Sequence, residues 1–327
     1  MALTGALVRV APGRGWVVFP RQNRWNQRVV AQFGGIPILT AFWSTDLLLP
    51  AVRPQAALLF GTGVLALLGL VDDRRGLGPK PKLVIEVLLA AWLVHAGVIY
   101  ALTPSSIANQ LLTLLWIVGI TNAFNLIDNM DGLAAGVAII ALAAIALLAG
   151  LNSPLAVLAL LLMVSIGGFW LFNLHPARVF MGDVGSLPIG FFLACASVMA
   201  ATRRPNPGAD VFLPALLLVV PLFDVLLVSI TRPLNGRAIS DGARDHTSHR
   251  LVLLGMSEVG AVALLHGITF LGGLLAICWV KVSTPWVVGC LALFLVALIF
   301  FWLFLARLAL PESWLSMVPG PLIRIPG

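Results

Sequence analysis

Two adjacent carboxylates, Asp72 and Asp73, open a short polar segment between two apolar runs. Four basic residues follow them within ten positions: Arg74, Arg75, Lys80 and Lys82. Carboxylates beside fixed positive charges suit a site that handles phosphate through a metal ion or through proton transfer. A solvated turn whose basic residues set the membrane topology has the same composition. Taken alone, this segment leaves both interpretations open.

A second polar segment reads NAFNLIDNMDG and places Asn122, Asn125, Asp128 and Asp131 three residues apart. If the preceding helix continues to Asp128, the first three side chains lie on one stripe, because positions i, i+3 and i+6 turn through only about 120° in total. Their amide and carboxylate oxygens suit Mg²⁺ and can also hydrogen-bond a base or a sugar. A helix cap would need only one such residue, so we favour a ligand-binding interpretation.

The third segment runs from Asn173 to Ser186 and contains Phe180, two glycines and Asp183. Glycines allow backbone N–H groups to approach a ligand closely, and Asp183 is well placed for a metal ion that bridges phosphates. We expect Ser186 to cap the next helix, whose N-terminal dipole favours anions. The alternative is an ordinary glycine turn that contains an aspartate.

Two histidines lie in the longest polar loop, where Arg244, His246, His249 and Arg250 follow in close order. Imidazoles can donate hydrogen bonds to phosphate or sugar oxygens, and the flanking arginines suit an anionic substrate better than a metal ion. A structural zinc site is not expected, because no cysteine or third histidine is nearby in the sequence. Asp224 lies inside an apolar run, where an ionisable group is costly unless it has a partner. We expect it to belong to a functional or hydrogen-bonded network.

The elements that position these segments are membrane helices. Of the 327 residues, 60% are hydrophobic and only 10% are charged, a balance typical of a protein that is solvated by a bilayer. A spanning helix needs about 20 mostly apolar residues. Ten such runs are present: 34–50, 55–71, 83–101, 107–124, 133–151, 154–173, 186–202, 210–231, 257–280 and 285–308. We therefore predict an all-α polytopic integral membrane protein with about ten transmembrane helices, which form a single catalytic domain over residues 34–308.

The charges predict how these helices are oriented. Alternating the loops between the two sides of the bilayer places all four polar segments on one side, together with sixteen basic residues against four on the other. The positive-inside rule makes this side cytoplasmic. We therefore predict cytoplasmic active-site loops, a cytoplasmic or interfacial N-terminal segment (1–33) and a cytoplasmic C-terminal tail (309–327). The net charge of +7 does not indicate nucleic acid, because the basic residues are not gathered in one soluble domain.

Together, the segments resemble the polyprenyl-phosphate N-acetylhexosamine-1-phosphate transferases (glycosyltransferase family 4), in particular their undecaprenyl-phosphate GlcNAc-1-phosphate branch. The resemblance is carried by Asp72-Asp73 with the later Lys82, by the Asn122 to Asp131 series, by Phe180-Met-Gly-Asp183 and by the histidine loop, in this order over about residues 15–310. It implies that a UDP-HexNAc, most simply UDP-GlcNAc, gives its sugar-1-phosphate to undecaprenyl phosphate. UMP would be released and cell-envelope glycan synthesis would begin, at the cytoplasmic face of a bacterial inner (plasma) membrane.

The resemblance also implies roles for individual residues. Asp183 and Asn125 would hold Mg²⁺, for which Mn²⁺ can substitute. Asp72, Asp73, Lys82 and Asp128 would be the catalytic group, and the first three would hold or activate the lipid phosphate. The residues implied in substrate binding are Asn122, Asp131, Asn173, Phe180, Lys80, Arg244, His246 and His249. Relatives form dimers, so a homodimer is a further expectation.

Two departures from the family pattern bear on specificity and on the start of the chain. The histidine loop reads His246-Thr247-Ser248-His249, whereas the muramyl-peptide branch carries three successive histidines. This favours a UDP-HexNAc and leaves a phospho-MurNAc-pentapeptide transferase as the alternative within the family. A non-catalytic membrane transporter is the alternative outside it, although a transporter would place charges near the bilayer midplane. Members also generally carry one more span before the segment around Pro20, so we expect the natural chain to begin further upstream.

Overall fold

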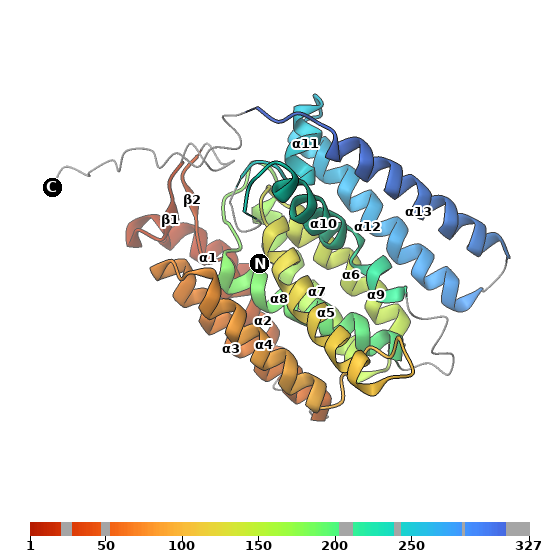
Figure 1. The fold of residues 1–327 in the computed structure, drawn as a ribbon. Helices are drawn as coiled ribbons and strands as arrows, with labels where there is room; N and C mark the ends of the chain where they lie inside the picture. The colour runs from red at the N-terminus through yellow and green to blue at the C-terminus, as the bar shows by residue number, and fades with distance from the viewer. Residues whose placement is uncertain (21–27, 47–52, 203–211, 239–242, 283–284, 312–327) are drawn as a thin grey trace.

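The computed structural model describes residues 1–20, 28–46, 53–202, 212–238, 243–282 and 285–311, and these are almost entirely helical (Figure 1). The helices, in chain order, are α1 (Ala2–Val10), α2 (Gly35–Asp46), α3 (Arg53–Arg75), α4 (Pro79–His95), α5 (Ser106–Ile127), α6 (Leu133–Ala149), α7 (Pro154–Asn173), α8 (Asp183–Thr202), α9 (Leu213–Leu217), α10 (Val219–Leu234), α11 (Thr247–Leu253), α12 (Glu258–Lys281) and α13 (Pro285–Ala306). Several begin where the sequence provides a cap. The Ser105, Ser153 and Ser257 hydroxyls accept a backbone N–H from the first turns of α5, α7 and α12.

A small irregular region connects α1 to α2. It contains a 3₁₀ turn, η1 (Pro12–Arg14), and two short antiparallel strands, β1 (Val17–Val18) and β2 (Val30–Ala31). Ala31 also forms a parallel bridge to Val179, in the loop that precedes α8. The predicted N-terminal segment (1–33) is therefore attached through its last residues to the third polar segment of the sequence.

Helix α8 is the centre of the bundle. It packs against α2, α3, α5 and α6, and its residues from Val184 to Ala201 are all buried. A helix that is apolar on every side is expected in the core of a bundle. Two glycines let the neighbouring helices α2 and α3 approach its first turn. A Cβ on Gly35 would lie 2.3 Å from the backbone nitrogen of Gly185, and a Cβ on Gly69 would lie 2.2 Å from the carbonyl oxygen of Asp183. Close backbone contact thus fixes the position of the α8 N-terminus.

The protein is a multi-pass membrane protein. A helix lies in each of the ten predicted spans, and six of the helices in the described part are long and apolar enough to cross a bilayer: α3, α5, α7, α8, α12 and α13. The others are shorter, and α2 stops at Asp46, beside residues outside the described part. Most of the predicted tail (309–327) also lies outside the described residues.

One predicted span, 210–231, is not a single helix. Helix α9 ends at Leu217 and α10 begins at Val219, so the prediction of one continuous span was wrong. The reason is Pro221, which has no backbone N–H to donate to the carbonyl of Leu217. The helix is interrupted at Leu218, about one turn before this proline.

The C-terminal helices form one edge of the molecule. Figure 1 shows α12 and α13 side by side at the edge opposite α3 and α4, with the short α11 near one end of the pair. Only Leu291 and Leu305 are buried on α13, while large side chains such as Trp286 and Phe300 are exposed. Such a helix suits contact with lipid. The sequence did not predict α11, which lies within the loop expected between the last spans.

Candidate active site

A lysine ammonium lies between two carboxylates at the start of α8. The Lys82 Nζ is 2.8 Å from Asp72 Oδ2 and 3.0 Å from Asp183 Oδ2. The three residues come from the C-terminal end of α3, the first turn of α4 and the first residue of α8. Burial disfavours the ammonium, but the charges and hydrogen bonds of Asp183 and Asp72 outweigh it and raise the pKa of Lys82 above its usual value. Lys82 therefore carries a positive charge at physiological pH.

Asn125 connects α5 to the same point. Its Nδ2 donates to Asp183 Oδ1 at 2.9 Å and to Ser186 Oγ at 2.7 Å. The Ser186 hydroxyl in turn donates to the carbonyl of Gly182. Helix α8 begins at Asp183 rather than at Ser186, so the expectation that Ser186 would cap it was wrong. The side chain instead lies within the first turn and holds Asn125.

Asp73 faces the backbone of α8. Its carboxylate accepts the N–H of Asp183 at 3.1 Å and the N–H of Val184 at 3.0 Å. The amide of Gln32, from the segment before α2, approaches to 3.4 Å. The anion that the sequence led us to expect at this helix N-terminus is therefore a side chain of the protein itself.

Asp128 is the first residue after α5 and is half-buried near this cluster. Burial, together with the negative charges of Asp183, Asp73 and Asp131, raises its pKa to about 7. A carboxyl group that is close to half-ionised at neutral pH can hold or release a proton, and it also responds strongly to a nearby cation.

The Asp131 loop is tied to the loop before α8. Asp131 Oδ2 accepts the N–H of Ala177 at 2.9 Å and lies 3.2 Å from His175 Nδ1. Asn173 is only 3% exposed, and its amide accepts from Gly132 N–H at 3.1 Å and donates to the carbonyl of Val179 at 2.8 Å. Predicted as a substrate ligand, Asn173 uses both amide atoms inside the protein. It is placed to fix the two loops relative to each other.

Phe180 follows directly in the second of these loops. Its N–H donates to the carbonyl of Ala31 at 2.8 Å, and its carbonyl accepts from Gly34 N–H at 2.9 Å. The backbone on both sides is thus fixed, while the ring is only half-buried. Lys80, also predicted to bind substrate, is exposed at the start of α4.

Sequence reasoning gave no role to Glu86. This residue is 1% exposed, and its Oε2 accepts a hydrogen bond from Asn122 Nδ2, which also donates to the carbonyl of Val118 at 2.9 Å. Its Oε1 is buried without a hydrogen-bond partner among the described residues. The signal was present in the sequence, because Glu86 is four positions after Lys82 and residues i and i+4 share a helix face.

The histidine loop is a buried ionic network. His246 Nδ1 lies 2.7 Å from Asp224 Oδ2, and Asp224 Oδ1 accepts the N–H of Thr247 at 2.6 Å. Arg232 forms a bidentate pair with Asp245, at 2.8 and 2.9 Å. The arginine and its hydrogen bonds hold the pKa of Asp245 below its usual range despite burial. The expectation that Asp224 belongs to a network is confirmed.

His249 and Ser248 lie on α11 beside this network. His249 is 3% exposed, and burial followed by the charge of His246 lowers its pKa to about 3, so it is neutral. The Ser248 hydroxyl donates to Asn129 Oδ1 at 2.7 Å, which joins α11 to the Asp128 loop. Arg244, half-buried, precedes the network. Both predicted histidines are thus more enclosed than a direct substrate ligand requires in this conformation.

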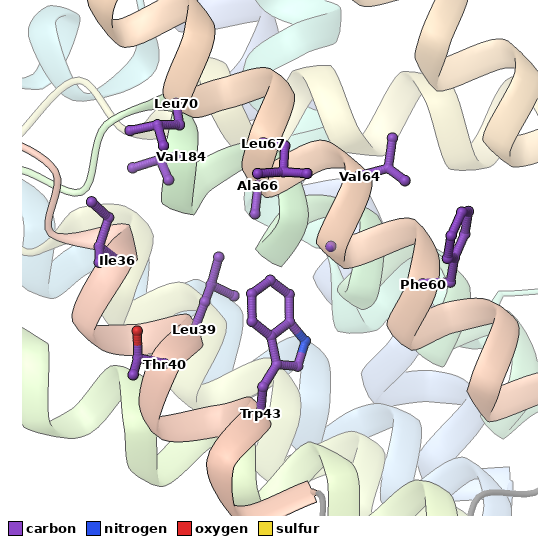
Figure 2. A pocket seen from close by; sticks show the side chains of 11 residues that line it. Ile36, Leu39, Thr40, Trp43, Phe60, Val64, Ala66, Leu67, Leu70 and Val184 are labelled. Atoms are coloured by element: carbon purple, nitrogen blue, oxygen red, sulfur yellow. The ribbon is translucent and has the colours of Figure 1, made fainter.

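An apolar groove of about 450 Å³ lies next to the polar cluster and is lined by residues of α2 and α3 and by Val184 of α8. Figure 2 shows side chains of α2 and α3 around it, with Trp43 and Phe60 towards one end and Leu70 and Val184 towards the other. The side chain of Val184 lines the groove, whereas its N–H donates to Asp73. The first turn of α8 therefore separates the charged cluster from an apolar surface.

The chain is similar in sequence to several known proteins. The sequence profile of glycosyl transferase family 4 matches residues 55–201. The chain is 32% identical, over 88% of its length and 83% of the relative, to the probable undecaprenyl-phosphate N-acetylglucosaminyl 1-phosphate transferase of Bacillus subtilis. It is 31% identical, over 80% of its length and 75% of the relative, to the decaprenyl-phosphate N-acetylglucosaminephosphotransferase of Mycobacterium tuberculosis. A phospho-N-acetylmuramoyl-pentapeptide-transferase of Staphylococcus saprophyticus is 28% identical, over 80% and 88%. The matched region includes the helices that carry the lysine, carboxylate and asparagine cluster, and the chain belongs to glycosyl transferase family 4.

Proposed function

We propose that this protein transfers a HexNAc-1-phosphate, with GlcNAc-1-phosphate favoured, from a UDP-HexNAc to undecaprenyl phosphate. The observation that carries the proposal is the cluster of Lys82 with Asp72, Asp183 and Asn125 at the start of α8. In the reaction, an oxygen of the lipid phosphate bonds to the phosphorus next to the sugar. The bond from that phosphorus to the bridging oxygen breaks, and UMP leaves with the electron pair. The names of the Bacillus subtilis and Mycobacterium tuberculosis relatives support the GlcNAc donor.

The donor atoms of the cluster suit a magnesium ion. Asp183 and Asn125 offer the carboxylate and amide oxygens that Mg²⁺ prefers, and Mg²⁺ is usually held by one or two carboxylates together with substrate phosphates and water. Among the described residues, no three His, Cys, Asp or Glu side chains gather to enclose a metal ion. A cation here would therefore be held jointly with the diphosphate of the donor. Its chemistry would be to stabilise charge on the leaving UMP.

The protein side chains would mainly position and neutralise the phosphates. A phosphate monoester has a second pKa near 6, so the lipid phosphate is already mostly ionised and needs no strong base. Lys82 offsets the repulsion between two anionic phosphates, and Asp72 orients Lys82 through their 2.8 Å contact. Asp128 and Asp131 would face the donor from the α5 side, with Asp131 in the part that reads the uridine. The buried network around His246 would hold the α11 loop over the sugar.

The membrane arrangement is part of the same proposal. We place the helices of the ten predicted spans across a bacterial plasma membrane, with the cluster at its cytoplasmic face. The charge distribution of the loops supports this orientation. A UDP-sugar is a cytoplasmic metabolite, whereas the lipid carrier lies in the bilayer, so a site at the end of the helices meets both.

The test is release of UMP by the purified protein in detergent with undecaprenyl phosphate and Mg²⁺. We expect UMP with UDP-GlcNAc or another UDP-HexNAc, and none with UDP-MurNAc-pentapeptide. Release with the muramyl peptide alone would establish the alternative within the family, and no release with any donor would reject the enzyme. Asp183→Asn should remove most of the activity while the exposed Arg307→Ala should retain it.

A further inference from the structure

We propose that Asp73 is a positioning residue, which fixes the N-terminus of α8 and with it Asp183, and does not itself contact the lipid phosphate. This inference rests on the proposed function for its catalytic consequence, but its structural part stands on the geometry alone. It separates two adjacent aspartates that the sequence pattern treats as a pair.

Both oxygens of Asp73 are already used by the protein. Oδ1 accepts the N–H of Asp183 and lies within 3.4 Å of the Gln32 amide, and Oδ2 accepts the N–H of Val184. Asp72 also uses both oxygens, but its partners differ: Oδ1 accepts the N–H of Leu77, after the end of α3, and Oδ2 contacts Lys82, a side chain that is itself part of the phosphate-handling cluster. A lipid phosphate could approach Asp72 through Lys82, whereas at Asp73 it would meet a carboxylate whose acceptors are directed into the α8 backbone.

The first turn of α8 needs such an acceptor. The first backbone N–H groups of a helix have no partner inside the helix, and a Ser, Thr, Asp or Asn at the N-cap usually satisfies one of them. Here the residue before α8 is Gly182, whose carbonyl accepts from Gly185 and Ser186 at 2.9 Å but which has no side chain. The carboxylate of Asp73 therefore supplies from α3 the cap that the local sequence lacks.

Gly182 and Asp73 are matched to each other. Gly182 has φ +72°, in the region that favours glycine, and a Cβ on it would lie 2.6 Å from Asp73 Oδ2. A local capping side chain at this position is excluded by the same carboxylate that replaces it. The glycine before α8 and the aspartate near the end of α3 thus depend on each other, because the glycine leaves the space that the carboxylate occupies.

The consequence reaches the reacting groups through Asp183. Its backbone is held by Asp73, and its side chain is held by Lys82 and Asn125. If the backbone contact is lost, the first turn of α8 loosens and the carboxylate proposed for the metal ion is no longer fixed. Removing a group that orients a metal ligand typically weakens metal affinity by about 10- to 100-fold. We therefore expect a defect in Mg²⁺ dependence rather than in lipid binding.

The structural arm of the test is hydrogen exchange by mass spectrometry on the protein without substrates. In Asp73→Asn, one acceptor oxygen becomes an N–H₂ group that opposes a backbone N–H, so amides of the first turn of α8 should exchange at least about tenfold faster than in the wild type. The matched control is Asp72→Asn, which changes contacts of the Lys82 and Asp183 side chains but removes no acceptor of an α8 backbone N–H, so the backbone amides of this turn should exchange as in the wild type. Equal exchange in Asp73→Asn and the wild type would overturn the capping role whether or not the protein is an enzyme.

The kinetic arm measures the rate against Mg²⁺ and, separately, against lipid phosphate. Asp73→Asn should raise the Mg²⁺ concentration for half-maximal rate by about tenfold or more and leave the KM for the lipid within about twofold. Gly182→Ala should act in the same direction, and the double variant should be no worse than the poorer single variant, because both disturb one contact. A large rise in the lipid KM at unchanged Mg²⁺ dependence would instead show that Asp73 contacts the acceptor. Absence of UMP from the wild type would reject the proposed function and leave the exchange result standing.

Should Asp73→Asn fail to fold, Gln32→Met provides the milder variant. It removes only the 3.4 Å contact to Asp73 and leaves both backbone hydrogen bonds in place. The shifts in exchange and in Mg²⁺ dependence should be in the same direction and smaller. Slower exchange, or a lipid KM defect without a Mg²⁺ effect, would contradict the proposal.

Discussion

Replacing Asp128 by Asn should make the protein more stable while it lowers activity. Burial, together with the negative charges of Asp183, Asp73 and Asp131, raises the pKa of Asp128 from 3.8 to about 7. Each pKa unit corresponds to about 1.36 kcal/mol, so an increase of about three units destabilises the folded protein by about 4 kcal/mol at and above neutral pH. The neutral amide of Asn avoids this destabilisation.

The pH dependence identifies the cause. Below about pH 4 the carboxyl is protonated in the folded and the unfolded protein, so ionisation of Asp128 costs no stability. Between pH 4 and 7 the unfolded chain ionises while the folded protein keeps the proton, and the destabilisation of the wild type grows as pH rises. Above pH 7 both states are ionised and the full effect remains. The difference between the variant and the wild type should therefore be largest at pH 8 and less than half as large at pH 5.

The assay is thermal unfolding in detergent at one scan rate, at pH 5 and pH 8, without divalent cations. About 4 kcal/mol corresponds to an increase in Tm of roughly 8 °C at pH 8 for a chain of this size. Mg²⁺ should narrow the difference, because a cation near Asp183 stabilises the charged form of Asp128. The matched control is Asp131→Asn on the same loop, whose carboxylate already accepts the N–H of Ala177 and which should not gain stability. A Tm for Asp128→Asn at or below the wild type at pH 8, or an equal difference at both pH values, would refute the reasoning.

Two further substitutions test the buried networks. Arg250→Met removes a guanidinium that is 2% exposed and donates to the carbonyls of Asp245 and Leu305 and to the hydroxyl of Thr231. At about 1 kcal/mol per hydrogen bond, the loss of these three bonds should lower Tm by roughly 6 °C. The control is Arg307→Ala, which changes an exposed residue just after α13 and should change Tm little. An unchanged Tm for Arg250→Met would show that the network does not hold α13. Glu86→Gln should raise Tm, because it replaces a buried carboxyl with one unpartnered oxygen by an amide, and a lower Tm would contradict this account.

The helices could be predicted from the sequence because the bilayer imposes a simple rule. A run of about 20 apolar residues indicates a helix, and each of the ten predicted intervals contains one. The rule describes length and composition alone, so it did not detect the break before Pro221. Nor did it detect α11, whose seven residues are held by tertiary contacts such as Ser248 to Asn129.

The candidate site could be predicted in part. Motif spacing placed Asp72 near Lys82, because one short polar segment of the sequence contains both, and it placed Asn122 and Asn125 on one side of α5. It could not place Asp183 beside Lys82, which is 101 residues away in the chain. That contact depends on the packing of α3 and α4 against α8, and the glycines that allow close packing look like ordinary helix glycines in the sequence. The buried partner of Asn122, Glu86, was missed for the same reason.

Helix geometry gives the two adjacent aspartates different directions, and tertiary contacts give them different partners. Asp72 and Asp73 both lie in the last turn of α3, and consecutive residues of an α-helix point about 100° apart. The two side chains therefore leave the helix in different directions, and α3 continues to Arg75. In the structure Asp72 contacts Lys82 of α4, whereas Asp73 accepts backbone N–H groups of α8. Two adjacent acidic residues at a helix end therefore need not share one role, and here the hydrogen bonds to the α8 backbone distinguish Asp73 from Asp72.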